Sequence, residues 1–394
     1  MKDVLRKIIS EREAELPEAE MGKLMKILVE EKEIISLGPG EPDFTPAKHI
    51  IKFAKQKLDQ GFTHYSPAEG RKELLEAIVK KLKKENRIDA CPENVIVTCG
   101  SNEAILLALM CCIDPGEQVL VPDPDYLTYI PMVELLNGWP VSMQLKQENG
   151  FQLVPEEIEI KEPKRTRAII IDNPANPTGA VYSKKVLEKI ADLAIENDLL
   201  ILSDEAYEKF VYKGNHVSIG SLNGMQDYVL TLHSFSKTYG MAGFRVGYAA
   251  GPEKVIAAMR KVHLYSTLCA PTISQLAALA ALRGPQVWVK KNVSEYNRRR
   301  KFVVKRLNEI PGFNCIEPQG AFYAFPKIDF SSKGKKLKSR EFCEFLIKNA
   351  KVACVPGTEF GRYGEGFVRF SYATAYDLIV KAMDRIEKAV KRLK

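Results

Sequence analysis

The sequence contains little that would indicate a secreted, metal-dependent or membrane-spanning protein. Its eight cysteines are scattered, without a Cys-x-x-Cys pair of metal spacing or a dense disulfide pattern. The longest apolar run, residues 104–113, is too short to cross a bilayer, and residues 1–20 mix both charge signs without an apolar signal segment. Four of the five histidines lack metal-ligand spacing: His49, His216, His233 and His263. We therefore expect a soluble, cytoplasmic protein with reduced cysteines, no metal centre and no membrane anchor.

The net charge of +8 does not indicate a nucleic-acid partner. The basic residues are concentrated in residues 333–340 and 381–394, where no aromatic side chains alternate with them. A solvated basic surface explains this pattern better than a binding face does. The sequence also contains no internal repeat and no low-complexity tract.

The length of 394 residues predicts two domains. Residues 45–285 alternate short β-branched runs with amphipathic stretches, which predicts a mostly parallel sheet between helices. Residues 286–394 show the pattern of a smaller α/β domain, and we expect residues 1–44 to pack with it. The strands predicted in the large domain are 95–98, 118–121, 168–171, 199–203 and 228–232, with a helix at 183–196; the small domain is predicted to contain strands at 322–325, 352–355 and 367–371 and helices at 286–308, 340–349 and 376–393.

Lys237 lies shortly after the apolar run 228–232, which predicts a buried strand. A lysine withdrawn from water at the end of such a strand has a pKa closer to neutrality, and its neutral amine can form a Schiff base with an aldehyde. Ser234, Ser236 and Arg245 supply hydroxyls and a guanidinium suited to a phosphate dianion. For so short a motif, a solvent-facing lysine in a flexible glycine-rich loop is the ordinary alternative.

Polar residues also follow three other predicted strands, where catalytic groups of such sheets are expected. Asn176 belongs to a turn held by two prolines, and Asp204 and Tyr207 follow the strand at 199–203. Residues Gly100-Ser101-Asn102 join a strand to a helix, where backbone amides can bind phosphate. Each cluster also has a purely structural interpretation. The Asn176 segment can be a plain Pro/Gly turn, Asp204 can be a helix N-cap, and the Gly100 segment can be a strand–helix junction of the kind common in α/β proteins.

Two further residues are unusual for their predicted surroundings. Arg369 lies on a strand between apolar residues, where an unpaired charge is costly, so it requires an anion. That anion is either a ligand carboxylate or an internal Asp or Glu. Tyr126 lies in the segment Pro124–Tyr129, either as a binding residue or as a core aromatic.

Taken in order from Gly38 to Ala373, these motifs closely resemble the class I and II aminotransferases, the fold type I enzymes that use pyridoxal 5′-phosphate. The resemblance is to the archaeal and bacterial aspartate and aromatic aminotransferases in particular. It implies that Lys237 is the cofactor lysine and acid-base catalyst, that Asp204 pairs with the pyridine nitrogen, and that Asn176 and Tyr207 bind the phenolic oxygen. It also implies a ping-pong transfer from an L-amino acid to a 2-oxo acid such as 2-oxoglutarate.

The resemblance assigns the remaining contacts as well. Tyr126 stacks on the cofactor ring, and Gly38 and Arg369, with Asn176, bind the substrate carboxylate. Tyr65, in the segment Thr63–Gly70, reaches the phosphate of a neighbouring subunit, which implies a homodimer with shared active sites. The phosphate of the subunit's own cofactor is bound by Gly100, Ser101, Asn102, Ser234, Ser236 and Arg245.

Two positions depart from the family pattern. Leu75 stands where the family often has an arginine, which concerns packing rather than chemistry. Asn102 stands where aspartate-preferring relatives have a lysine, so we expect an aromatic or broad preference, with aspartate as an open alternative. Two other functions compete: a carbon–sulfur β-lyase on the same fold, and a regulator, which would need a DNA-binding segment for which the residues before Gly38 leave no room.

Overall fold

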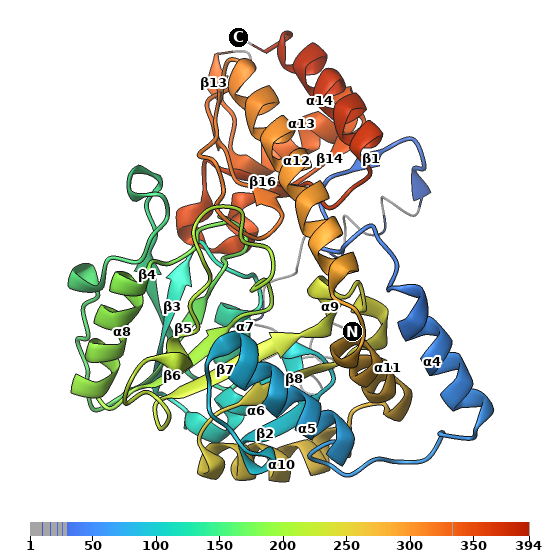
Figure 1. Ribbon diagram of the computed structural model, residues 1–394. Coiled ribbons are helices and arrows are strands. Elements are labelled where there is room, and N and C mark those ends of the chain that lie inside the picture. The colour runs from blue at the N-terminus through green and yellow to red at the C-terminus, as the bar shows by residue number, and fades with distance from the viewer. Residues whose placement is uncertain are drawn as a thin grey trace, which may run out of the picture.

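The computed structural model describes residues 30–332 and 334–393, together with Ser10, Leu16, Gly22 and Lys26. Figure 1 shows a central sheet with helices around it, and a C-terminal part, coloured orange to red, next to it. We expect residues 1–44 to pack with the C-terminal part, but many of these positions lie outside the described residues. No helix in the part of the chain that the structure describes is long and apolar enough to span a membrane.

A seven-stranded sheet forms the centre of the fold, with the strand order β2-β8-β7-β6-β5-β3-β4. β8 is antiparallel to both of its neighbours, and the other strands run parallel, so the sheet is mostly parallel as predicted. All five strands predicted for this region are present, and the sequence did not reveal β4 and β8. The strands are β2 (Val95–Thr98), β3 (Gln118–Asp123), β4 (Trp139–Gln144), β5 (Thr166–Asp172), β6 (Leu200–Asp204), β7 (Val229–Ser234) and β8 (Gly247–Ala250).

Helices cover both faces of this sheet because its strands are apolar on both faces. Ile169 and Ile171 of β5 pack in one hydrophobic cluster with α8, whereas Ile170 packs in another with α6 and α10. This alternation follows from the two-residue period of a strand. The helices of this part are α4 (Lys48–Asp59), α5 (Lys72–Lys81), α6 (Ser101–Cys112), α7 (Tyr129–Leu135), α8 (Lys184–Glu196), α9 (Phe235–Thr238), α10 (Glu253–Ser266) and α11 (Thr272–Arg283).

Local signals set the starts of two helices that matter below. Ser183 caps α8, because its Oγ accepts a hydrogen bond of 3.3 Å from the Val186 backbone N–H. α6 begins at Ser101, with Gly100 as its N-cap residue. Ser101 and Asn102 therefore belong to the first turn of α6 rather than to the loop before it.

The C-terminal part contains α12 (Val287–Glu309), α13 (Ser339–Ala350) and α14 (Tyr376–Val390), and α12 extends from the central part into it (Figure 1). The predicted strand 352–355 is in fact two strands of different sheets, because β14 pairs with the N-terminal strand β1 and β15 pairs with β16. Residues 35–36 are thus joined to the C-terminal part. The strands are β1 (Ile35–Ser36), β9 (Phe313–Asn314), β10 (Tyr323–Ala324), β11 (Lys327–Ile328), β12 (Ser331–Ser332), β13 (Lys335–Lys336), β14 (Val352–Ala353), β15 (Val355–Pro356) and β16 (Val368–Ser371).

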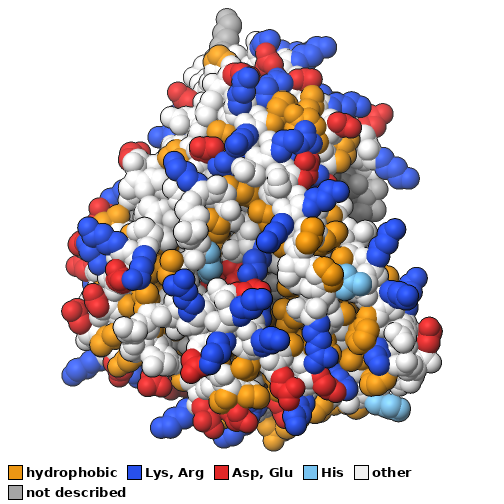
Figure 2. Space-filling model, in the orientation of Figure 1, with side chains coloured by type: hydrophobic (Ala, Val, Ile, Leu, Met, Phe, Trp, Pro, Cys, Tyr) orange, Lys and Arg blue, Asp and Glu red, His pale blue; other side chains and the backbone are white. Residues whose placement is uncertain are grey.

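The surface carries charges of both signs. On the face shown in Figure 2, Lys and Arg side chains are interspersed with Asp and Glu side chains. Several basic residues form ion pairs at the surface, such as Lys335 with Glu341 at 3.0 Å. The net positive charge is therefore spread over this face rather than gathered into one basic patch.

Candidate active site

A cavity of about 380 Å³ opens at the carboxyl edge of the central sheet. Because β3, β5, β6 and β7 are parallel, the polar residues at their ends reach the same edge. Three separate parts of the chain contribute to the wall: the loop at 39–41, the ends of the central strands, and Tyr323 and Arg369 of the C-terminal part.

One end of this cavity has groups that are suited to binding a phosphate. Ser101 in the first turn of α6, Ser234 and Ser236 line it, and Arg245 lies beside them. Gly100 has φ +90°, and a Cβ atom at this position would lie 2.6 Å from Nη2 of Arg245. The glycine thus allows the guanidinium to approach the start of α6, where backbone N–H groups point outward. Hydroxyls, a helix N-terminus and a guanidinium together are suited to a dianion.

Lys237 lies in α9, directly beyond the end of β7. Its Nζ donates a hydrogen bond of 2.6 Å to the carbonyl oxygen of Gly40. Burial, followed by the nearby positive charge of Arg369, lowers the pKa of Lys237 to about 8. The amine is therefore much closer to its neutral, nucleophilic form than an exposed lysine is.

Asp204 is the last residue of β6 and is buried. Its Oδ1 accepts a hydrogen bond of 3.0 Å from the Ala206 N–H, and its Oδ2 accepts one of 3.2 Å from the Tyr129 hydroxyl. Burial raises the pKa of Asp204 to about 6, although these hydrogen bonds and the charge of Lys237 act against the rise. A cationic group in the cavity would stabilise the carboxylate here.

Arg369 is buried in β16, and its partners are neutral. Nη2 donates to the Gly38 carbonyl oxygen at 2.6 Å, and Nη1 donates to Oδ1 of Asn176 at 2.8 Å. Its Nε has no acceptor among the described residues. The guanidinium carbon also lies 4.4 Å from the ring centroid of Tyr323. A buried guanidinium held by neutral groups, with N–H donors left unused, is arranged to bind an anion from the cavity.

The structure brings almost all of the sequence-predicted residues together. Gly38 and Gly100 do not line the cavity themselves. Gly38 contacts Arg369 and Gly100 lies next to Arg245, and both arginines line it. Tyr65 is the exception, because its side chain is 83% exposed and does not line the cavity. The predicted residues that line the cavity are Ser101, Asn102, Tyr126, Asn176, Asp204, Tyr207, Ser234, Ser236, Lys237, Arg245 and Arg369.

Sequence reasoning missed Tyr323 and Asp172, which also line the cavity. The Tyr323 hydroxyl lies 2.7 Å from the Tyr207 hydroxyl, so the two phenols form one hydrogen-bonded pair. A hydroxyl-bearing aromatic on the apolar strand 322–325 was the available signal for Tyr323. Asp172 was visible only as the first residue of the Asn176 turn, without a role of its own.

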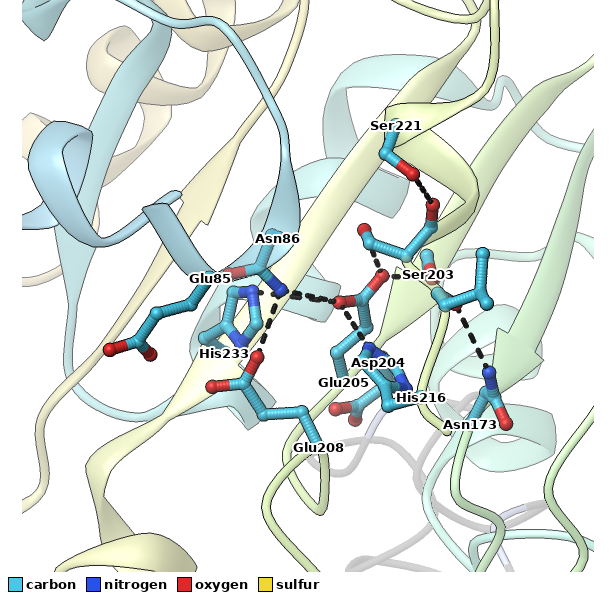
Figure 3. A network of polar contacts seen from close by, with 12 residues as sticks. Glu85, Asn86, Asn173, Ser203, Asp204, Glu205, Glu208, His216, Ser221 and His233 are labelled. Atoms are coloured by element: carbon cyan, nitrogen blue, oxygen red, sulfur yellow. Dashed lines mark hydrogen bonds and ion pairs between the residues drawn. The ribbon is translucent and has the colours of Figure 1, made fainter. Parts of the chain in front are cut away.

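A second polar network lies next to the site, around Glu205 (Figure 3). The oxygens of Glu205 and Glu208 and a ring nitrogen of His216 lie within 4.8 Å of one another, close enough to share a cation. However, Glu208 already pairs with Lys81 at 2.5 Å. Because the Glu205 oxygens are fully supplied with donors, we interpret the network as a structural anchor. The donors to Glu205 are Asn86 Nδ2 at 3.2 Å, Ser203 Oγ at 3.1 Å, His216 Nε2 at 2.9 Å and Ser218 Oγ at 2.6 Å.

Comparison with known proteins agrees with this geometry. A family model for aminotransferase class I and II matches residues 32–386. The chain is 47% identical over 380 residues to an aspartate aminotransferase of Pyrococcus abyssi, covering 95% of this chain and 96% of that protein. It is also 47% identical over 390 residues to aromatic-amino-acid aminotransferase 2 of Thermococcus litoralis, covering 98% and 99%. A crystal structure of an aromatic aminotransferase from Pyrococcus horikoshii matches with a TM-score of 0.87 at 46% identity, covering 93% and 98%.

Proposed function

Because the chain belongs to the class I and II aminotransferases and is a transaminase, we propose that it transfers the amino group of an aromatic or broad range of L-amino acids to 2-oxoglutarate, with pyridoxal 5′-phosphate as cofactor. The observation that carries this proposal is the meeting of Lys237, Asp204 and Arg369 around one cavity. They provide an amine with a lowered pKa, a buried carboxylate and a guanidinium with an unused donor. Donor and acceptor would use this site in turn, which is a ping-pong order.

The phosphate end of the cavity fits this cofactor. Ser101, Ser234, Ser236 and Arg245 would bind the phosphate, and the backbone at Gly100 leaves room for it. Asn102 lies at the same helix start, and its Oδ1 accepts a hydrogen bond of 3.2 Å from the Tyr126 hydroxyl. That bond would fix the Tyr126 ring in the orientation needed for stacking on the cofactor.

The opposite end fits the cofactor ring. Asp204 would pair with the pyridine nitrogen, and Tyr207 would bind the phenolic oxygen. Asn176 would do the same, because its Oδ1 already accepts from Arg369 and its NH₂ group remains as the donor. When bound, the cofactor supplies an electron sink that stabilises negative charge on the α-carbon of the substrate.

The substrate would be held and deprotonated by two residues of the chain. Arg369 would bind the α-carboxylate through its remaining N–H donors, while Gly38 and Asn176 hold the guanidinium in place. Lys237 would accept the proton from the α-carbon of the substrate and then donate it to the cofactor. A pKa of about 8 suits an amine that must both accept and donate a proton near neutral pH.

The cavity wall favours apolar or aromatic substrate side chains. Leu127, Tyr126 and Tyr323 give it an apolar surface, and Asn102 and Glu41 provide no cation for a side-chain carboxylate. Relatives of near-equal similarity are named for aspartate and for aromatic amino acids, so their names alone do not decide the preference. The neutral Asn102 is the residue on which the aromatic or broad preference rests.

We also propose that the protein is a cytoplasmic homodimer with shared active sites. The high exposure of Tyr65 supports this, since a large aromatic side chain at the surface is available to a second subunit.

The proposed domains are residues 45–285 and 286–394, with residues 1–44 associated with the second. The carbon–sulfur lyase alternative is not favoured, because the similar proteins are named aminotransferases.

Single-turnover absorbance spectroscopy tests the proposed activity. Purified holoprotein is mixed with one L-amino acid at a time, without a keto acid, and the conversion of the cofactor to its amine form is followed. We expect fast conversion with phenylalanine, tyrosine and glutamate and slow conversion with aspartate. Fast conversion with aspartate would contradict the proposed preference. No conversion with any of them, together with release of ammonia and pyruvate from a cysteine conjugate, would support the lyase instead.

A further inference from the structure

Two carboxyl groups meet at the wall of the active-site cavity, which Asp172 lines. Asp172 ends β5, Asp125 lies in the loop after β3, and the side chain of each is only 2% exposed. Oδ2 of Asp125 finds no N–H or O–H donor among the described residues. The carboxyl of Asp172 lies within hydrogen-bond reach of the Asp125 carboxyl. Two ionised carboxylates are both acceptors only. A hydrogen bond between them therefore requires that one of the two carries a proton.

The surroundings of this pair also favour a retained proton. The ionisable groups that interact most strongly with it are Asp123 of β3, Asp204 of β6 and the phenols of Tyr126, Tyr129 and Tyr182. The cations Lys237 and Arg369 line the same cavity as Asp172 but form no ion pair with either carboxyl of the pair among the described residues. Burial, followed by the neighbouring carboxylates, raises the pKa of both aspartates well above the usual range. Two like charges in contact cannot both remain ionised in such a place.

The pair joins two loops that carry active-site residues. Oδ1 of Asp125 accepts a hydrogen bond of 2.7 Å from the backbone N–H of Tyr126. Oδ2 of Asp172 accepts one of 2.8 Å from the backbone N–H of Asn176. Asn176 in turn binds Arg369 at 2.8 Å. The contact between the carboxyl groups thus connects the Tyr126 loop to the residues that hold the Arg369 guanidinium.

We propose that Asp125 and Asp172 share one proton, and that this proton bridge positions the Tyr126 and Asn176 loops for binding of the substrate carboxylate. Loss of the proton at alkaline pH places a second negative charge between the loops and weakens substrate binding. Both aspartates act through other residues and are positioning residues. The effect on substrate binding rests on the proposed function, whereas the shared proton does not.

Infrared spectroscopy of the purified protein tests the shared proton directly. At pH 7, above the pKa of about 6 for Asp204, we expect a carbonyl stretch from a protonated carboxylic acid. This band should be lost in Asp125→Asn and retained in the control Asp192→Asn, which changes an exposed aspartate on α8. Absence of the band in the wild-type protein, or its persistence in both Asp125→Asn and Asp172→Asn, would overturn the proposal.

Steady-state kinetics with phenylalanine and 2-oxoglutarate test the positioning role. In Asp125→Asn the amide can donate to Asp172 and accept from Tyr126, so we expect KM close to wild type at pH 7. The rise of KM at alkaline pH that we predict for the wild type should be absent in this variant. Asp125→Ala breaks the bridge and should raise KM on the order of tenfold, the loss expected for one hydrogen bond. Equal KM values for the two variants would contradict the positioning role. Absence of turnover in the wild type would instead contradict the proposed function and leave the infrared result unaffected.

Discussion

The amine of Lys237 differs from those of the surface lysines through its surroundings alone. Partial burial beside Arg369 lowers its pKa to about 8, so its neutral form predominates only above that pH. We therefore predict that the rate at which the apoprotein binds pyridoxal 5′-phosphate covalently rises with pH and has a midpoint near 8. The rate can be followed by absorbance with rapid mixing. A midpoint near the usual value of an exposed lysine, about 10.4, would show that the amine is not held as described.

Arg369 offers a second test at the level of one side chain. A lysine at this position could not hold Gly38, Asn176 and a substrate carboxylate at once, because it lacks the planar fork of donors. We predict that Arg369→Lys raises KM for the amino acid about 10- to 100-fold, as expected for loss of a charge-assisted hydrogen bond. The matched control is Arg298→Lys on α12, where the arginine side chain is 53% exposed. An unchanged KM in Arg369→Lys would show that Arg369 does not bind the substrate carboxylate.

A residue's place in the site could be predicted from sequence only where a short motif around that residue indicates it. Lys237, Asp204 and Asn176 lie in short motifs after strand ends, so their meeting at one sheet edge could be expected from sequence. Tyr323 could not, because its contact with Tyr207 joins positions 116 residues apart. The Asp125–Asp172 pair was missed for the same reason: only the packing of β3 beside β5 brings the two carboxyl groups into contact.

At the scale of elements, strands rich in β-branched residues were predicted well and the others were not. β5 and β7 have long apolar runs, and their positions agree with prediction. β8 consists of Gly247–Ala250, small residues around one tyrosine, which have low strand propensity. β4 at the sheet edge contains Pro140 and an exposed Trp139, so it shows no buried alternation. Neither omission alters the fold: the prediction of a fold type I, mostly parallel α/β sheet is confirmed.

The junction between β2 and α6 gives an element-scale prediction. An alanine at Gly100 would need φ +90° and would bring a Cβ atom to 2.6 Å from Nη2 of Arg245. We predict that Gly100→Ala increases the dissociation constant for pyridoxal 5′-phosphate on the order of tenfold, because the guanidinium is displaced from the phosphate end of the cavity. Equilibrium dialysis of the apoprotein would measure it.

Gly116→Ala is the matched control for this prediction. Gly116 has a similar φ of +87°, but nothing lies within 4 Å of the position where a Cβ would be added. Both variants therefore carry the same kind of backbone strain, and only Gly100→Ala carries the clash. Equal losses of affinity in the two variants would show that strain, rather than displacement of Arg245, is responsible.

At the scale of the whole molecule, the active site depends on distant parts of the chain. The loop containing Gly38, the central sheet and Arg369 of β16 meet at one cavity, and β1 joins β14 in the same region. Such an assembly explains why the sequence indicated the site only through several separate motifs. The domain boundaries at 44/45 and 285/286, and the packing of residues 1–44 with the smaller domain, stay predictions.

A mixed-dimer experiment tests the shared site at this scale. If Tyr65 of one subunit completes the site that contains Lys237 of the other, Tyr65→Ala and Lys237→Ala each impair every site in their own homodimers. Co-expression of the two variants would restore one intact site in each mixed dimer, and random pairing then predicts about a quarter of wild-type activity. Activity no higher than the mean of the two separate variants would indicate that the sites are not shared in this way.

The central claim is that Lys237 is the residue that holds the cofactor of this transaminase. The most direct measurement is borohydride reduction of the purified holoprotein, which fixes the cofactor to the amine that binds it, followed by peptide mass spectrometry. We predict a single pyridoxyl group on the peptide that contains Lys237, and none on the Lys237→Ala variant. A pyridoxyl group on a different lysine, or no stable modification of the wild-type protein, would contradict it.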